Sequence, residues 1–147
     1  MTEHATPSIR AAQTDDLPHL HAIQRATLAE PAPELLSSIV EGAGLSLVAQ
    51  LDRPVGYVLA LTPGGVAYVP ELAVESAVQR RGIGSQLLEA VVERAREAGA
   101  VDVRLTVRLE DEGARAFYRE QGFDVRERLA DHFETGSGTG LLLARQL

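Results

Sequence analysis

The chain has 147 residues, of which 45% are hydrophobic, and it contains no cysteine. This size predicts one globular domain over 1–147 with a substantial core, and the lack of cysteine excludes disulfides, zinc thiolate sites and an acyl-cysteine intermediate. The net charge of −7 argues against nucleic acid and anionic membranes as partners, because both need a basic surface. No apolar run is long enough to span a membrane and the chain does not begin like a signal peptide, so we expect a cytoplasmic protein.

The residue pattern of the first half of the chain predicts one strand, two helices and three further strands. The strand covers 8–12, and a helix follows from a cap at 14–16 to about residue 28, with a buried stripe of Leu17, Leu20, Ile23 and Leu28. Two prolines then precede a shorter helix at 34–41. Strand-like runs at 45–51, 55–61 and 66–74 are separated by short turns, which predicts antiparallel pairing between successive strands.

The second half alternates helices and strands. A helix at 83–98 has a wide apolar face and ends at Gly99, and a strand follows at 101–107. The crossover through this helix predicts that 66–74 and 101–107 are parallel. A helix at 112–121 and strands at 123–128 and 141–145 complete an α/β fold. We expect a mixed, largely antiparallel sheet of six to seven strands with helices on both faces.

The junction between residues 79 and 85 has the features of an anion site. Gly82 and Gly84 permit close approach of a ligand and positive φ. The first-turn donors of the following helix would be the amides of Arg81, Gly82, Ile83, Gly84 and Ser85. Arg80 and Arg81 add positive charge, so a pyrophosphate would fit. A plain strand-to-helix turn with solvated arginines explains these residues about equally well.

Two common phosphate-binding motifs do not fit this segment. Leu87 stands where the dinucleotide fingerprint has its third glycine, and the Walker motif requires a lysine, which this chain lacks.

Two motifs resemble a known family. The segment 79–84, Gln-Arg-Arg-Gly-Ile-Gly, is similar to the Gln/Arg-x-x-Gly-x-Gly/Ala signature of the GNAT superfamily of acetyl-CoA-dependent N-acetyltransferases. The segment 114–123 resembles that superfamily's Ala-x-x-Phe-Tyr-x-x-x-Gly-Phe pattern, in the same order and with a helix and a strand between them. The resemblance implies acetyl-CoA as cosubstrate and an amine as acceptor.

The resemblance also implies a set of cofactor contacts. They are Leu72, Ala73, Val74, Gln79, Arg80, Arg81, Gly82, Ile83, Gly84, Ser85 and Asp111. In the superfamily, the strand equivalent to 66–74 bulges and splays from its parallel neighbour, so that pantetheine can pair with it. Asp111 departs from the asparagine frequent in relatives, which puts that contact in doubt.

Acetyl transfer to an amine needs a base and a group that stabilises the leaving thiolate. Glu71 is the candidate base, because it lies near the strand end that should face the acetyl group and relatives often have a glutamate nearby; a solvated strand glutamate is the alternative. Tyr118 holds the motif position of the leaving-group acid, where hydrogen bonding to the thiolate is more economical than full proton transfer; the alternative is a core tyrosine. We expect no metal site, since His19 and His21 should point to different faces of a helix.

These residues favour direct transfer of acetyl from acetyl-CoA to a primary amine of a small molecule or peptide. An alternative is N-terminal acetylation of a ribosomal protein, but Thr106 replaces the acidic residue of such enzymes, and His132 and Phe133 replace their tyrosine pair. Two further hypotheses are a non-catalytic acetyl-CoA or CoA sensor and an interaction domain without a nucleotide site. Dimers are common among similar proteins, so a homodimer is compatible with the resemblance.

Overall fold

The computed structural model describes residues 5–134 and 136–147, and seven of its segments form one sheet in the order β1-β2-β3-β4-β5-β7-β6. The strands are β1 (Ser8–Ala11), β2 (Leu45–Gln50), β3 (Pro54–Leu61), β4 (Val66–Val74), β5 (Asp102–Arg108), β6 (Asp124–Leu129) and β7 (Gly140–Gln146). β4 and β5 are parallel, and the other neighbouring pairs are antiparallel. The predicted α/β fold with a mixed, largely antiparallel sheet is confirmed.

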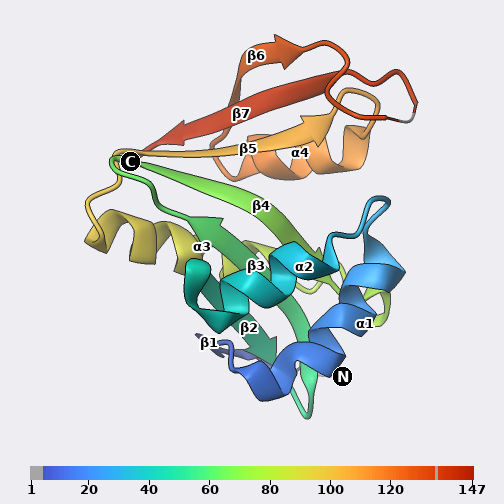
Figure 1. Cartoon of the computed structure of the whole chain (residues 1–147), viewed down its shortest axis with the longest axis vertical. Helices are drawn as coiled ribbons and strands as arrows, with labels where there is room; N and C mark the ends of the chain where they lie inside the picture. The colour runs from blue at the N-terminus through green and yellow to red at the C-terminus, as the bar shows by residue number, and fades with distance from the viewer. Residues whose placement is uncertain (1–4, 135) are drawn as a thin grey trace.

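In the described part of the chain, four α-helices cover the sheet: α1 (Leu17–Thr27), α2 (Pro33–Ser38), α3 (Ile83–Glu97) and α4 (Glu112–Glu120). Short helical turns lie at η1 (Thr14–Asp16), η2 (Ile39–Ala43) and η3 (Ser76–Val78). In Figure 1, α1 and α2 lie over β2 and β3, with α3 behind the same strands. None of the helices in the described ranges is both long and apolar enough to cross a membrane.

The entry to α1 is fixed by an ion pair between a buried aspartate and a partly exposed arginine. The Asp16 carboxylate accepts hydrogen bonds from the Arg10 guanidinium, at 2.8 Å on each oxygen, and from the Gln13 amide at 2.8 Å. These donors hold the pKa of Asp16 below its ordinary value, the Arg10 hydrogen bond contributing most. The pair therefore joins β1 to the start of α1.

One face of α1 packs on the sheet, and its composition differs from the predicted stripe. Leu20 and Ile23 are buried as expected, whereas Leu17 and Leu28 are only half-buried. Gln24 is completely buried on the same face, one helical turn after Leu20. A polar side chain thus occupies a core position.

β4 and β5 pair at one end only. Their parallel pairing covers Val66 to Tyr68, while β5 stays paired with β7 as far as Arg108. Figure 1 shows β4 and β5 diverging from a common end near the C-terminus. The two halves of the sheet are therefore splayed along the later part of β4.

β4 also contains a bulge. Glu71 pairs with Leu59 of β3 and Tyr68 pairs with Leu61, so three steps along β4 match two along β3. Pro70 lies within this stretch, where its missing N–H costs no ladder bond. The bulge and splay implied by the family resemblance are both present.

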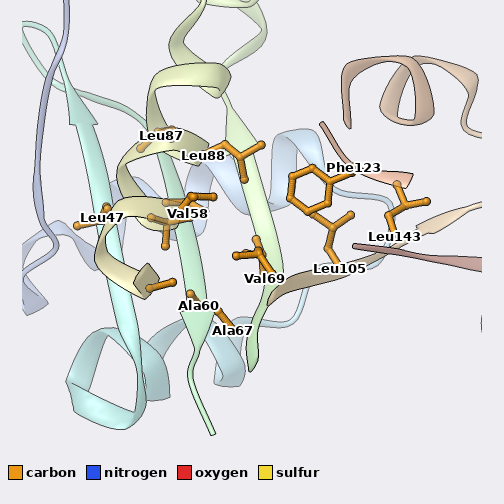
Figure 2. Packing of buried hydrophobic residues seen from close by; sticks show 14 of the residues in the cluster. Leu47, Val58, Ala60, Ala67, Val69, Leu87, Leu88, Leu105, Phe123 and Leu143 are labelled. Carbon is orange, nitrogen blue, oxygen red and sulfur yellow. The ribbon is translucent and has the colours of Figure 1, made fainter. Parts of the chain in front are cut away.

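An apolar core joins the two halves of the sheet despite the short ladder. It contains Leu87 and Leu88 of α3 together with Leu105, Phe123 and Leu143 from the second half (Figure 2). A second core lies under α1 and α2 and includes Tyr57 and Ala73.

Candidate active site

A cleft of about 610 Å³ lies between the end of β4, the start of α3 and α4. It is lined by Leu72, Val74, Gln79, Arg80, Gly82, Ile83, Gly84, Ser85, Asp111, Gly113, Ala114, Phe117 and Tyr118. All the predicted cofactor residues except Ala73 and Arg81 are in this wall. Ala73 is buried in the core under α1 and α2, and Arg81 is exposed outside the lining.

The loop before α3 has the backbone of an anion cradle. Gly82 is the N-cap of α3 with φ of 79°, in the left-handed region that glycine tolerates. The first turn closes when Gln86 N–H donates to Gly82 O at 3.0 Å, so the amides of residues 83–85 precede the first intrahelical hydrogen bond. The Gln79 side chain donates to Val74 O at 2.8 Å and ties this loop to the end of β4.

The helices on either side of this cleft approach closely. A Cβ on Gly84 would lie 3.5 Å from the Phe117 ring, and Gln121 Nε2 donates to Ser85 Oγ at 3.0 Å. α3 and α4 are therefore joined at the cleft by packing and by a hydrogen bond.

A second cavity, of about 360 Å³, opens on the other side of Tyr118. Its wall includes Thr27 at the end of α1, Leu28, Ala29 and Glu30 after it, Val69, Pro70 and Glu71 of β4, Leu105, Thr106, Val107 and Arg108 of β5, and Phe133. It shares Leu72, Asp111, Ala114 and Tyr118 with the first cleft. The two cavities thus meet where β4 and β5 diverge.

The bulge in β4 determines where Glu71 points. Before the bulge, Ala67 and Val69 belong to the core under α3; after it, Ala73 belongs to the core under α1 and α2. Glu71 faces the same side as Ala73, toward α1 and α2, and is only 8% exposed. It nevertheless contributes to the wall of the second cavity. The bulge therefore places a carboxyl group between the α1 core and that cavity.

The Glu71 carboxylate is held by two buried side chains. Tyr57 OH donates to Glu71 Oε1 at 2.9 Å, and Gln24 Nε2 donates to Oε1 and Oε2 at 2.9 and 3.1 Å. Burial raises the pKa of Glu71 above its ordinary value, and the hydrogen bonds from Gln24 and Tyr57 oppose that rise. A carboxyl group with a raised pKa is a better match for proton abstraction near neutral pH.

Tyr118 stands at the junction of the two cavities. Its ring packs edge-on against Phe117 and Phe123, with centroid distances of 5.0 and 5.6 Å. Burial, and then the charge of Asp111, raise the pKa of the phenol. The hydroxyl consequently stays protonated at neutral pH and can donate a hydrogen bond.

Asp111 caps α4. Its carboxylate accepts from the Ala114 amide at 3.0 Å, as an N-cap residue should. It also lies in the wall of both cavities. Asp111, which departs from the family pattern, thus stabilises the start of α4 as its N-cap.

The outer rim of the second cavity is an ion-paired network. Arg108 Nη2 lies 2.5 Å from Glu30 Oε1, and the Arg108 guanidinium lies 4.4 Å from the centre of the Phe133 ring. Glu110 Oε1 is 3.7 Å from Arg108 Nη1. This network connects the segment after α1 with the end of β5 and the segment after β6.

Sequence reasoning missed Gln24 and Tyr57. A signal existed for Gln24, because a glutamine one turn after Leu20 interrupts an apolar stripe. Tyr57 gives no such signal, since a tyrosine in an apolar strand usually indicates core packing.

Comparison with known proteins identifies the family. Residues 7–123 match the model of the acetyltransferase (GNAT) family, and the chain therefore belongs to this family. It is an acetyl-CoA-dependent N-acyltransferase, as the sequence motifs predicted.

Related sequences carry the same class of name. An uncharacterised N-acetyltransferase of Methanocaldococcus jannaschii is 28% identical over 94% of this chain and 91% of its own length. The [ribosomal protein bS18]-alanine N-acetyltransferase of Salmonella typhimurium is 28% identical over 89% of this chain and 90% of its own length. A second M. jannaschii protein, an uncharacterised N-acetyltransferase, is 33% identical over 51% of this chain. The matched part makes up only 36% of that relative's length.

Solved structures share the fold at lower identity. Ard1 from Thermoplasma volcanium superposes with a TM-score of 0.88 at 23% identity, covering 97% of this chain and 99% of that one. The PaiA N-acetyltransferase of Thermoplasma acidophilum, solved with coenzyme A, gives 0.83 at 18% identity, covering 97% and 100%.

Proposed function

We propose that this protein transfers acetyl from acetyl-CoA directly to a primary amine of a small molecule or peptide. The observation that carries this proposal is the meeting of two cavities at Tyr118: one contains the loop of the family signature, and the other contains Glu71. The first would hold the cofactor and the second the amine.

In this proposal the cofactor follows the first cleft. Its pyrophosphate accepts hydrogen bonds from the amides of residues 83–85, with the helix dipole and Arg80 adding attraction. Its pantetheine runs along the edge of β4 at 72–74, which β5 leaves unpaired beyond Tyr68. The thioester then reaches the junction of the two cavities.

The reaction needs one bond formed and one broken. The amine nitrogen attacks the thioester carbonyl, the C–N bond forms, the C–S bond breaks, and coenzyme A leaves as a thiolate. Glu71 accepts the proton of the amine, directly or through water. Tyr118 donates a hydrogen bond to the thiolate, since a phenol is a weaker acid than a thiol and keeps its proton. A free amide on the splayed edge of β4 would polarise the carbonyl.

N-terminal acetylation of a protein is the second candidate. It is favoured by the similarity to the bS18-alanine N-acetyltransferase along nearly the whole chain. Thr106, which replaces the acidic residue of that group, lies in the wall of the second cavity with its hydroxyl 3.1 Å from Tyr68 OH. This second function would therefore also depend on Glu71 as the base.

Calorimetric titration with acetyl-CoA, with NADH and ATP as controls, tests cofactor binding. A panel of amines and of short peptides with free N-termini, assayed by release of coenzyme A thiol, then tests transfer. Selective binding and turnover with at least one acceptor are expected. Binding without turnover would indicate a sensor, and absence of binding to the folded protein would remove the proposed cofactor site.

A further inference from the structure

Gln24 lies outside the family motifs, yet it is the side chain that makes most contacts with the candidate base. We propose that Gln24, together with Tyr57, is a positioning residue that keeps Glu71 ionised and fixed in the wall of the second cavity. The inference rests on the proposed role of Glu71 as the base. Gln24 and Tyr57 act through Glu71 and need not touch either substrate.

The contacts around Glu71 suit a carboxylate rather than a carboxylic acid. Both oxygens accept hydrogen bonds from Gln24 Nε2, and Oε1 also accepts from Tyr57 OH. All the hydrogen bonds that Glu71 makes among the described residues use donors on its partners. A protonated Glu71 would need an acceptor for its own O–H; Gln24 Nε2 offers none, and the Tyr57 hydroxyl could accept only by giving up its own donation to Glu71.

The Gln24 amide is itself oriented for this purpose. One Nε2 hydrogen serves the two Glu71 oxygens, and the other is free for Ala32 O at 3.0 Å. Gln24 Oε1 is buried and has no hydrogen-bond partner within the described part of the chain. The amide thus uses its donors fully and leaves its acceptor unused, because Glu71 requires donors.

The same amide connects the base to the wall of the acceptor cavity. Ala32 ends the connection between α1 and α2, whose first residues, Leu28 to Glu30, line that cavity. Gln24 therefore fixes Glu71 and the adjoining wall relative to each other. An acceptor that displaces this wall would also disturb the base.

Besides Tyr57, which donates to Glu71 directly, other ionisable groups lie around this carboxylate. His21 on α1 contributes a favourable charge. Glu30 after α1, Arg108 on β5, and Asp111 and Tyr118 at α4 share the second cavity with Glu71. Gln24 is distinguished from these groups by its burial and by its bonds to both carboxylate oxygens.

The test measures the titration of Glu71 by ¹³C NMR of protein labelled on its glutamate side chains. The Glu71 signal is assigned as the one that is missing in Glu71→Gln. Gln24→Met keeps the side chain's length and removes its donors, so we expect the Glu71 titration midpoint to rise by about one pH unit. Tyr57→Phe should raise the Glu71 midpoint by a smaller amount. If Gln24→Met does not fold, Tyr57→Phe alone provides the test. Asp16→Asn is the matched control: it breaks a buried hydrogen-bonded group at the start of the same helix and should leave the midpoint unchanged.

The pH dependence of kcat/KM, measured with the best acceptor of the amine panel, gives the second readout. The acidic limb should move upward with the NMR midpoint, giving about tenfold lower kcat/KM at acidic pH and near-normal values on the plateau. An unmoved midpoint in both variants would overturn the positioning role. A shifted midpoint with full activity in Glu71→Gln would instead remove Glu71 as the base and leave the positioning intact.

Discussion

Gly82 tests the proposed anion cradle because its backbone, rather than its surroundings, excludes other residues. Its φ is 79°, and a Cβ built there would meet no atom within 4 Å. Gly82→Ala should therefore cost only backbone strain, about 1–2 kcal/mol. Where the loop keeps its positive φ in the free protein, that strain lowers Tm by roughly 3–6 °C for a chain of this length.

The effect on acetyl-CoA follows from the same strain. Any part of this strain that the free loop relieves by relaxing to a negative φ no longer lowers Tm and must be restored on binding, so complete relaxation would lower affinity about 5- to 30-fold. Gly82→Val, with a β-branched side chain in this region, should abolish measurable binding while the protein still folds. Calorimetry measures the affinity and thermal denaturation measures the strain.

Gly99 offers a matched control at the other end of α3. Its φ is 92°, a Cβ added there would meet no atom within 4 Å, and it is exposed, as Gly82 is. Gly99→Ala should lower Tm by a similar amount and leave acetyl-CoA affinity unchanged. Wild-type acetyl-CoA affinity in a folded Gly82→Val variant, with Gly99→Ala also binding normally, would refute the placement of the pyrophosphate at this loop.

Three other substitutions test the site and the fold. Tyr118→Phe should reduce kcat about 10²- to 10⁴-fold with little change in acetyl-CoA affinity, as measured by thiol release and calorimetry; unchanged turnover would make it a core residue. Glu71→Gln should lower kcat/KM by a similar factor and remove the acidic limb of its pH profile, a limb that burial places above the ordinary carboxyl pKa; a retained limb would assign the base to another group. Asp16→Asn should destabilise the fold at pH 7 by about 1–2 kcal/mol, allowing for the partial exposure of Arg10. Because the folded-state pKa of Asp16 is lowered, its stabilisation is present above about pH 4 and lost as the pH falls further, so wild type and variant should converge in acid denaturation scans.

The fold could be predicted because its elements have strong local signals. The apolar face of α3, with Ile83, Leu87 and Leu88 buried, follows directly from helical spacing, and Gly99 ends the helix as expected. The parallel pairing of β4 and β5 follows from the crossover. The loop proposed to bind the cofactor is recognisable from its glycines and its family signature.

The second cavity could not be predicted in the same way, because it depends on contacts between distant segments. The position of Glu71 on a strand suggests a base, but its partners come from residues 24 and 57. Which side Glu71 faces depends on the bulge near Pro70, and alternation along β4 alone would place it with Val69. The same bulge turns the Ala73 side chain into the core under α1 and α2, which leaves the backbone of Ala73 as the part predicted to contact the cofactor.

The short pairing between β4 and β5 has a consequence for the unfolding of the molecule. Among the described residues, backbone hydrogen bonds across the middle of the sheet are confined to the stretch from Gly65 to Tyr68, so the half formed by β5, β7, β6 and α4 should open before the rest. A cosubstrate bound between the two halves of the sheet would contact both and so stabilise their association. At a concentration 100 times its Kd it would add about 2.7 kcal/mol to the cost of opening. Slower amide exchange in both flanking strands should then accompany cofactor binding.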